Sequence, residues 1–351
     1  MANTVELHRA LALNDSDDTE LFTFLLSVGD SESFRQSPTR SSVFYYQGHE
    51  WYLTCGGFDD KESVTQLGVF LYWTGTNTAG LRCRADYRII VRNVQDPAES
   101  LISEGQQVLF NAPKSLGWGK RGLGPLSDIL SVSKGFLVEP SGTIIVELAL
   151  KGGKTIFEQT VDISQILEDP SQSDNPYKSY FTPNFSLAGF EFYLSVYPFG
   201  DREEAGGHVS MYLHRYIKAA NPNLGCRIRY RFFIGGHVSP GDSKTFEFSF
   251  KNDHGYGRFK AFDPLSSTDL LRRGPVPVGV EILSITSYAQ VELPLTTRGY
   301  YHTDNFVFED VAFGDQRGNR WKLSVNNTSQ VRIFLTILES NQKAFFFFFK
   351  P

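Results

Sequence analysis

Short apolar and aromatic runs recur along the whole chain, and turn-forming clusters separate them. These clusters include Gly56-Gly57, Asp96-Pro97, Gly152-Gly153 and Gly235-Gly236. Between Arg82 and Asn93, apolar residues alternate with arginines and one aspartate, apart from Ile90. A period of two with one apolar face is typical of an antiparallel strand that is half buried in a sheet. Almost no segment has the period of a long helix, so the pattern predicts an all-β protein.

The pattern also repeats. Cys83-Arg84-Ala85-Asp86-Tyr87-Arg88 has a counterpart in Cys226-Arg227-Ile228-Arg229-Tyr230-Arg231, at an offset of 226 − 83 = 143 residues. Nearly the same offset relates Trp51-Tyr52-Leu53 to Phe192-Tyr193-Leu194, Val69-Phe70-Leu71 to Met211-Tyr212-Leu213, and Trp118-Gly119 to Tyr256-Gly257. A third copy is partial: Trp321 to Val325 repeats Phe192 to Val196, and Val331 to Leu335 repeats Val209 to Leu213. The repeats predict three units, at residues 18–151, 152–290 and 291–351.

Several motifs occur in the same order in the first two units. In unit one they are Gly48-His49-Glu50-Trp51-Tyr52-Leu53, Leu67-Gly68-Val69-Phe70-Leu71, Tyr87-Arg88-Ile89, Trp118-Gly119 and Gly135-Phe136-Leu137-Val138. In unit two they include Tyr197-Pro198-Phe199-Gly200, Tyr230-Arg231-Phe232, Tyr256-Gly257 and Asp269-Leu270-Leu271. Together they resemble the MATH (meprin and TRAF homology, TRAF-like) domain. The resemblance implies tandem antiparallel eight-stranded β-sandwiches, followed by a partial third copy.

The resemblance further implies a module that binds an extended peptide in a shallow, aromatic-lined groove on one sheet. Carried over position by position, the groove of unit one is lined by Phe70, Tyr87, Val108, Trp118 and Lys120. The matching positions of unit two are Tyr212, Tyr230, Phe246, Tyr256 and Arg258. Family members often carry aromatic residues where this chain has Val108 and Lys120 or Arg258. These departures suggest a more cationic groove, which would accept an acidic residue or a phosphate.

Some of these positions have a simpler interpretation. Tyr87 and Tyr230 lie on the apolar parity of their strands, which favours plain core packing. Trp118 and Tyr256 are better candidates for ligand contact, because neighbouring glycines place them in irregular backbone. The arginines at 82, 84, 88 and 92 are interpreted as a solvated outer face of the sheet rather than as an anion site.

Charge and cysteine content limit the classes of function. The chain has 351 residues, with 34 basic and 39 acidic ones, so its net charge of −5 disfavours nucleic acid as a partner. The three cysteines are scattered, which fits a reducing, cytoplasmic compartment. The N-terminal stretch lacks the basic and apolar regions of a signal peptide, and no apolar run approaches the length of a membrane span. We therefore expect no membrane insertion.

The sequence contains only weak matches to motifs for nucleotide binding, metal binding or catalysis. Gly117 to Gly122 fits the string G-x-G-x-x-G, but Gly124-Pro125 follows at once and cannot open the long helix of a nucleotide site. The seven histidines form no metal-binding pattern, so no cofactor or metal is expected. The leading hypothesis is a non-enzymatic intracellular adaptor or scaffold that binds peptide segments of partner proteins, Ser/Thr-rich or acidic ones included. One alternative is a structural or assembly protein that has lost the groove, and another is an enzyme with a scattered site.

The partial third unit raises a separate question. Half a sandwich exposes a sheet face and unpaired edges, and Phe345 to Phe349 would be prone to aggregation in water. We expect this unit to pack against unit two, or to be completed by a partner or by a second copy of the chain. The second case would make the protein an oligomer.

Overall fold

The computed structural model describes residues 3–13, 19–74, 78–111, 117–162, 178–198, 200–201, 209–216, 224–235, 237–238, 244–248, 274–289, 311–314, 320–327 and 331–339. Its description of side chains ends at residue 285 and omits residues 11–13, 224, 237 and 244–248. Most of the described residues lie in antiparallel strands, as the all-β prediction requires. No helix in the described ranges combines the length and the apolar character needed to cross a membrane.

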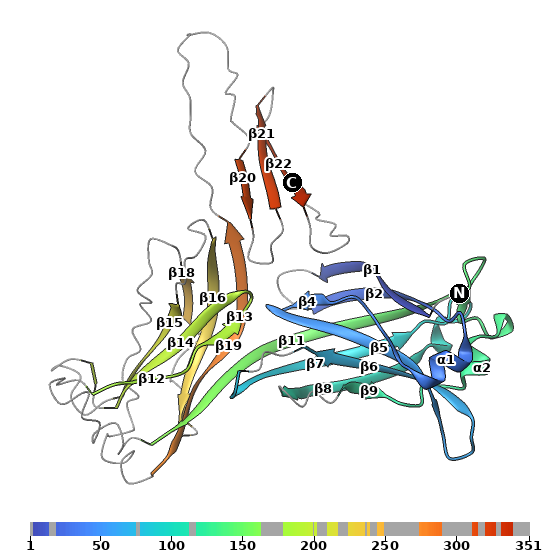
Figure 1. Cartoon of the computed structure of the whole chain (residues 1–351), viewed down its shortest axis with the longest axis horizontal. Helices are drawn as coiled ribbons and strands as arrows, with labels where there is room; N and C mark the ends of the chain where they lie inside the picture. The colour runs from blue at the N-terminus through green and yellow to red at the C-terminus, as the bar shows by residue number, and fades with distance from the viewer. Residues whose placement is uncertain are drawn as a thin grey trace.

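The first unit is a sandwich of two antiparallel sheets (Figure 1). Its larger sheet contains β1 (Thr4–Leu13), β2 (Thr19–Ser27), β7 (Leu81–Val91), β8 (Leu101–Asn111), β10 (Leu137–Val138) and the first part of β11 (Thr143–Val161). The smaller sheet contains β3 (Thr39–Arg40), β4 (Phe44–Tyr46), β5 (His49–Asp59), β6 (Thr65–Trp73) and β9 (Trp118–Lys120). Short helices occupy the connections: α1 (Ser31–Gln36), α2 (Leu126–Ile129), and the 3-10 turns η1 (Pro97–Glu99) and η2 (Val132–Lys134).

The second unit has a similar two-sheet arrangement. Its part of the larger sheet contains the end of β11, β16 (Leu224–Ile234), β17 (His237–Val238), β18 (Lys244–Phe248) and β19 (Val276–Ala289). Its smaller sheet contains β12 (Tyr180–Phe181), β13 (Phe185–Leu187), β14 (Phe190–Tyr197) and β15 (Ser210–Tyr216).

The strand predicted between Arg82 and Asn93 forms as β7. Cys83, Ala85, Tyr87, Ile89 and Val91 are buried, and the arginines lie on the opposite, outward face. Aromatic rings fill the space between the sheets: Trp51 of β5 meets Phe110 of β8 edge-on at 4.8 Å between ring centroids. The core therefore lies between the two sheets, which leaves the outer face of each sheet for other contacts.

The long strand β11 joins the two units into one ten-stranded sheet, and Figure 1 shows it reaching from one sandwich to the other. Thr143 to Leu150 pair with β2, and Thr155 to Val161 pair with β19, so the chain does not turn at Gly152-Gly153. The expectation of a turn there is wrong, as it is at Gly56-Gly57 inside β5. The register of β11 against β7 does shift between Lys151 and Lys154, where the sequence places the unit boundary.

Further contacts fix the junction between the units. The Gly48 carbonyl accepts a hydrogen bond from the Ala188 N–H at 2.9 Å, which joins the β4–β5 turn to the equivalent β13–β14 turn. The Gly153 N–H donates to the Tyr46 hydroxyl at 2.9 Å. The Phe157 and Phe185 rings stack at 4.2 Å between centroids. The junction is thus a packed extension of the core and not a flexible linker.

Three hairpins share one register at the positions that the repeats align. Leu53 pairs with Leu71 in unit one, and Leu194 pairs with Leu213 in unit two. In the C-terminal sheet of β20 (Val311–Gly314), β21 (Arg320–Asn327) and β22 (Val331–Glu339), Leu323 pairs with Leu335. The division of the chain into three units stays a prediction. The tail around Phe345 to Phe349 lies outside the described residues, and so does any completion of the third unit.

Candidate functional site

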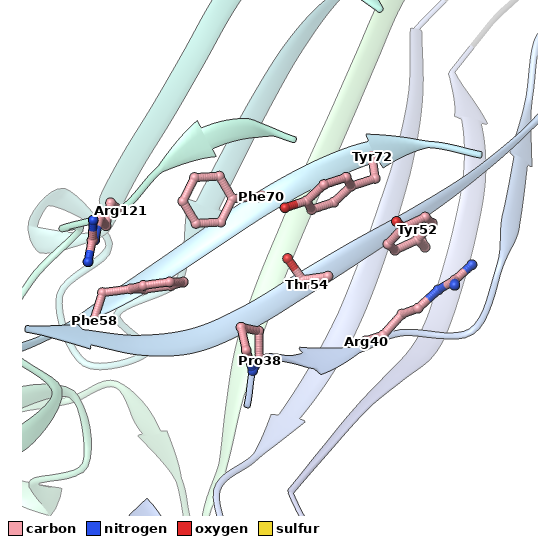
Figure 2. A pocket seen from close by; sticks show the side chains of 8 residues that line it. All are labelled: Pro38, Arg40, Tyr52, Thr54, Phe58, Phe70, Tyr72 and Arg121. Atoms are coloured by element: carbon pink, nitrogen blue, oxygen red, sulfur yellow. The ribbon is translucent and has the colours of Figure 1, made fainter. Parts of the chain in front are cut away.

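An open pocket of about 660 Å³ lies on the outer face of the smaller sheet of unit one (Figure 2). It is lined by Pro38, Arg40, Tyr52, Thr54, Phe58, Phe70, Tyr72 and Arg121. Pro38 precedes β3, Arg40 is the last residue of β3, and Arg121 directly follows β9; the other five residues belong to β5 and β6. Phe70 is the single residue of this set that the sequence analysis placed in a groove.

The side chains of β5 alternate between the core and the outer face of the sheet, and the outward ones form part of the pocket floor. Trp51, Leu53 and Cys55 are buried, so Tyr52 and Thr54 between them face outward. The register of the β5–β6 pair then sets Tyr52 opposite Tyr72 and Thr54 opposite Phe70. Cross-strand neighbours of this kind share one face of a sheet, so the four side chains form a continuous surface.

The rings of the floor are arranged in two pairs, each next to a guanidinium. Tyr52 and Tyr72 stack at 5.0 Å with an interplanar angle of 4°, and the Arg40 Cζ lies 3.6 Å from the centre of the Tyr52 ring. Phe58 and Phe70 meet edge-on at 5.6 Å, with the Arg121 Cζ at 5.3 Å from the Phe58 ring. Figure 2 shows the two arginines at opposite ends of the pocket. The surface therefore offers apolar area in the middle and positive charge at both ends.

Two glycines of the G-x-G-x-x-G string have a packing role beside this pocket. A Cβ on Gly119 would lie 2.0 Å from the Val69 carbonyl oxygen, and a Cβ on Gly117 would lie 2.3 Å from the Tyr72 ring. Only glycine permits so close an approach of this segment to β6. Because Gly119 is directly opposite Phe70, no side chain from β9 lies beside that ring.

Trp118 and Lys120 lie on the other parity of β9 from Gly119. They are opposite the buried Leu71 and Val69, at the edge where the two sheets of unit one come together. Trp118 is 42% exposed, and its Nε1–H donates to the Leu109 carbonyl on β8 at 3.2 Å. Lys120 is exposed. Both side chains are accessible, but they line this edge and not the pocket floor that contains Phe70.

The remaining predicted groove residues have different placements. Tyr87, Val108 and Tyr230 are buried, so the structure places them in the core, as the parity of the two tyrosines indicated. Burial raises the pKa of the Tyr230 hydroxyl above its ordinary value. Phe246 is in β18, but its side chain is not described, and Tyr256 and Arg258 lie outside the described residues. Peptide contact at any of these positions stays a prediction.

Unit two carries a related aromatic surface at the aligned positions. Tyr193 and His214 stack at 4.7 Å with an interplanar angle of 10°, in the place of Tyr52 and Tyr72. The Ser195 Oγ lies 2.8 Å from the His214 Nε2. Tyr212, the counterpart of Phe70, donates from its hydroxyl to the Asp201 carboxylate. Burial, and to a smaller extent the nearby Tyr197, raises the pKa of the Tyr193 hydroxyl above its ordinary value.

The cysteines do not fit a nucleophilic site. Cys55, Cys83 and Cys226 are free and buried. Burial raises the pKa of the Cys55 and Cys226 thiols to about 12, and it raises that of Cys83 as well. A thiol attacks as its thiolate, so these side chains are inert at neutral pH.

Sequence reasoning missed most of the pocket, although a signal for it existed. Tyr52, Phe70 and Tyr72 occupy the outward parity of strands whose inward parity is already apolar. A solvated sheet face normally carries polar residues at such positions, so aromatic ones there indicate a contact surface.

Part of the chain matches a known protein family. Residues 171–273 match the family model of the MATH domain. This confirms the family prediction for that segment, and the antiparallel sheets described above agree with the sandwich that the family implies. No curated protein matches the chain.

Proposed function

We propose that this chain, of which residues 171–273 match the MATH family model, binds extended peptide segments of partner proteins on the outer faces of its smaller sheets. MATH domains are protein–protein interaction modules, so a general binding role follows from the match itself. The proposal adds two points: the ligand is an extended peptide, and both units offer a binding surface.

The observation that carries the proposal is the pocket between Arg40 and Arg121. Its stacked and edge-on rings accept apolar or aromatic side chains of an extended segment, and the Thr54 hydroxyl in the floor is available to a peptide backbone. A carboxylate at either end of the segment would meet a guanidinium. Lys120 supplies one more cation along the β9 edge. We therefore expect ligands with acidic or Ser/Thr-rich flanks around an apolar centre.

In this proposal the protein is an adaptor or scaffold without catalytic activity, and it works in the cytoplasm. The buried, protonated thiols agree with this role, since none of them is available for nucleophilic chemistry. The equivalent surface at Tyr193 and His214 gives the chain a second contact point. Because β11 and the packed junction connect the units, two segments of one partner would be held at a fixed separation.

One observation favours a second candidate function. Tyr87 and Val108 are buried, so two of the five inferred groove positions of unit one face the core. In this alternative the chain is a structural or assembly protein that uses its outer sheet faces for fixed contacts.

The test is a pull-down with mass spectrometry that compares the wild type with the double variant Tyr52→Ala/Phe70→Ala. Loss of these rings should reduce captured peptide-type partners by about tenfold or more, since buried aromatic anchors dominate such interfaces. Val132→Ala, an exposed apolar change away from the pocket, is the matched control and should change nothing. Circular dichroism confirms folding of each variant. An unchanged partner list for the double variant would reject the groove and favour fixed assembly contacts.

A further inference from the structure

A row of three residues crosses the strands of the unit-one pocket. Arg40 of β3 is opposite Thr54 of β5, and Thr54 is opposite Phe70 of β6. Side chains that are opposite one another in a sheet are neighbours on the same face. The short Thr54 side chain is partly exposed and lies among the rings of the pocket floor (Figure 2). The row therefore places a guanidinium and a phenyl ring on either side of an accessible hydroxyl.

Arg40 contacts a ring and not a carboxylate. Its Cζ lies 3.6 Å from the centre of the Tyr52 ring, which is a cation–π contact. Among the described residues, none has a carboxylate within ion-pair distance of Arg40, and none accepts a hydrogen bond from its guanidinium. Glu50, on the outward parity of β5, accepts a hydrogen bond from the Tyr45 hydroxyl instead. A guanidinium that contacts a ring keeps N–H donors for a second partner, and a carboxylate fits them in a bidentate manner.

Arg121, at the opposite end of the pocket, is less available to a ligand carboxylate because the protein places Asp59 near it. Hydrogen bonds from Thr65 and Arg35 lower the pKa of the Asp59 carboxyl, and the charge of Arg121 lowers it further. The positive charge of Arg121 is thus already partly offset within the protein. The two ends of the pocket are therefore not equivalent, and Arg40 is the better site for an added carboxylate.

The counterpart of this row in unit two has no guanidinium. Phe181 of β12 is opposite Ser195 of β14, and Ser195 is opposite Tyr212 of β15. Phe181 thus stands where unit one has Arg40, and it is 54% exposed. Ser195, in the middle of the row, is fully buried, and its Oγ lies 2.8 Å from the His214 Nε2. The row of unit two therefore lacks the cation of unit one, and its central hydroxyl is not accessible to a ligand.

We propose that Arg40 makes the surface of unit one selective for a segment that carries a carboxylate beside an aromatic residue, and that the surface of unit two lacks this preference. The ligand ring packs against the rings around Thr54, and the neighbouring carboxylate meets the N–H groups of Arg40. In unit two the Asp201 carboxylate, which accepts a hydrogen bond from the Tyr212 hydroxyl, disfavours an acidic ligand. The inference rests on the proposed function, because it names the specificity of the same pocket.

The dimensions of the row indicate the spacing of the two ligand residues. Neighbouring strands are about 4.8 Å apart, so Thr54 and Arg40 are separated by one such step. In an extended segment, residues two positions apart point to the same side and lie about 6.6 Å from each other. The long Arg40 side chain covers the difference. An aromatic and an acidic residue with one residue between them therefore fit the row.

The test measures fluorescence anisotropy of two labelled peptides, with the full chain as the binding protein. In the first peptide one serine separates a central phenylalanine from a glutamate on either side, and the second has glutamine in place of both glutamates. We expect the wild type to bind the first peptide about tenfold more tightly. Arg40→Gln, and Arg40→Phe with the residue type of unit two, should lower this ratio to about one. Arg40 is exposed, so both variants should remain folded.

Arg121→Gln, an equal change of charge at an exposed site of the same pocket, is the matched control and should keep the ratio. A wild-type ratio near one, an unchanged ratio in Arg40→Gln, or an equal loss in Arg121→Gln would overturn the inference.

The double variant Tyr52→Ala/Phe70→Ala tests the pocket itself and should weaken the binding of both peptides. If it binds both as tightly as the wild type does, the pocket is not the site and the proposed function fails. Weaker binding by the double variant, together with an unchanged ratio in Arg40→Gln, would reject the inference alone. Absence of saturable binding for both peptides would overturn the inference and the proposed function together.

Discussion

His49 lies at the junction of the two units and shows how residues from both are packed there. Its Nε2 lies 2.6 Å from the Thr155 Oγ1, and its ring meets Trp73 edge-on at 5.2 Å between centroids. Burial lowers the pKa of the imidazole from 6.5 to about 3. The side chain is therefore neutral in the folded protein across the physiological range, and it acts as a structural hydrogen-bonding group.

This burial predicts a pH dependence of stability. Below pH 6.5 the unfolded chain protonates His49, whereas the folded chain does so only near pH 3. The contribution of the neutral His49 side chain to the free energy of unfolding is thus complete above pH 6.5. It is lost as the pH falls toward 3, by up to about 1.4 kcal/mol per pH unit. Urea denaturation of wild type and His49→Gln should give free energies of unfolding that converge as the pH falls through this window. His8→Gln, at an exposed site, should follow the wild type, and parallel curves for His49→Gln would contradict the argument.

Among the elements, β11 makes a close contact with the rest of unit one at a glycine. Gly153 lies against Tyr46: a Cβ at this position would come within 2.6 Å of the Tyr46 Cε1. The same residue donates its N–H to the Tyr46 hydroxyl. The close approach lets the strand continue past the register shift and into the second unit.

We predict that Gly153→Ala destabilises the protein by about 1–3 kcal/mol, because the added methyl group overpacks the contact with Tyr46. Chemical denaturation measures the loss. Gly122→Ala is a suitable control, since its Cβ would meet only Gln66 at an ordinary 3.7 Å. If both variants lose the same stability, the cost comes from the general loss of glycine and not from the contact.

The same element shows where sequence patterns succeed and where they do not. Alternation predicted β7 correctly and indicated that Tyr87 and Tyr230 would be buried, because burial on one face is a local property of a strand. A Gly-Gly pair can form a turn, or it can let the backbone of a strand come close to another side chain. Which of the two occurs depends on the residue that lies next to the pair in space. The partner of Gly153 is Tyr46, more than a hundred residues earlier. For the same reason Phe70 was identified alone, since its neighbours Tyr52 and Tyr72 became recognisable only through the register of β5 and β6.

Among the residues whose side chains the structure describes, one buried core runs through both units. Buried residues from Val5 to Ile282 form a single hydrophobic cluster, and the stacked pair Phe157 and Phe185 is part of it. Residues Thr155 to Phe157 pair on one side with β7 and on the other with β19. Such continuity of sheet and core couples the stabilities of neighbouring units.

We therefore predict that a core change in one unit weakens both. Phe34 is fully buried in α1 of unit one, and Phe34→Leu should lower hydrogen-exchange protection in β14 and β15 as well as in β5 and β6. The exposed change Val132→Ala should leave all four strands unaffected. Loss of protection confined to unit one would mean that the units unfold independently.

The shared strand also covers sheet edges at the junction of the two units. In the intact chain, Leu81 to Arg84 of β7 are covered by Lys154 to Phe157, and the other side of Thr155 to Phe157 is covered by β19. A fragment cut at the boundary of residues 151 and 152 would leave the backbone N–H and C=O groups of Leu81 to Arg84 without these partners, and open sheet edges recruit strands from other molecules. Each unit thus covers a strand edge of its neighbour, and we expect a fragment cut at this boundary to aggregate more readily than the intact pair.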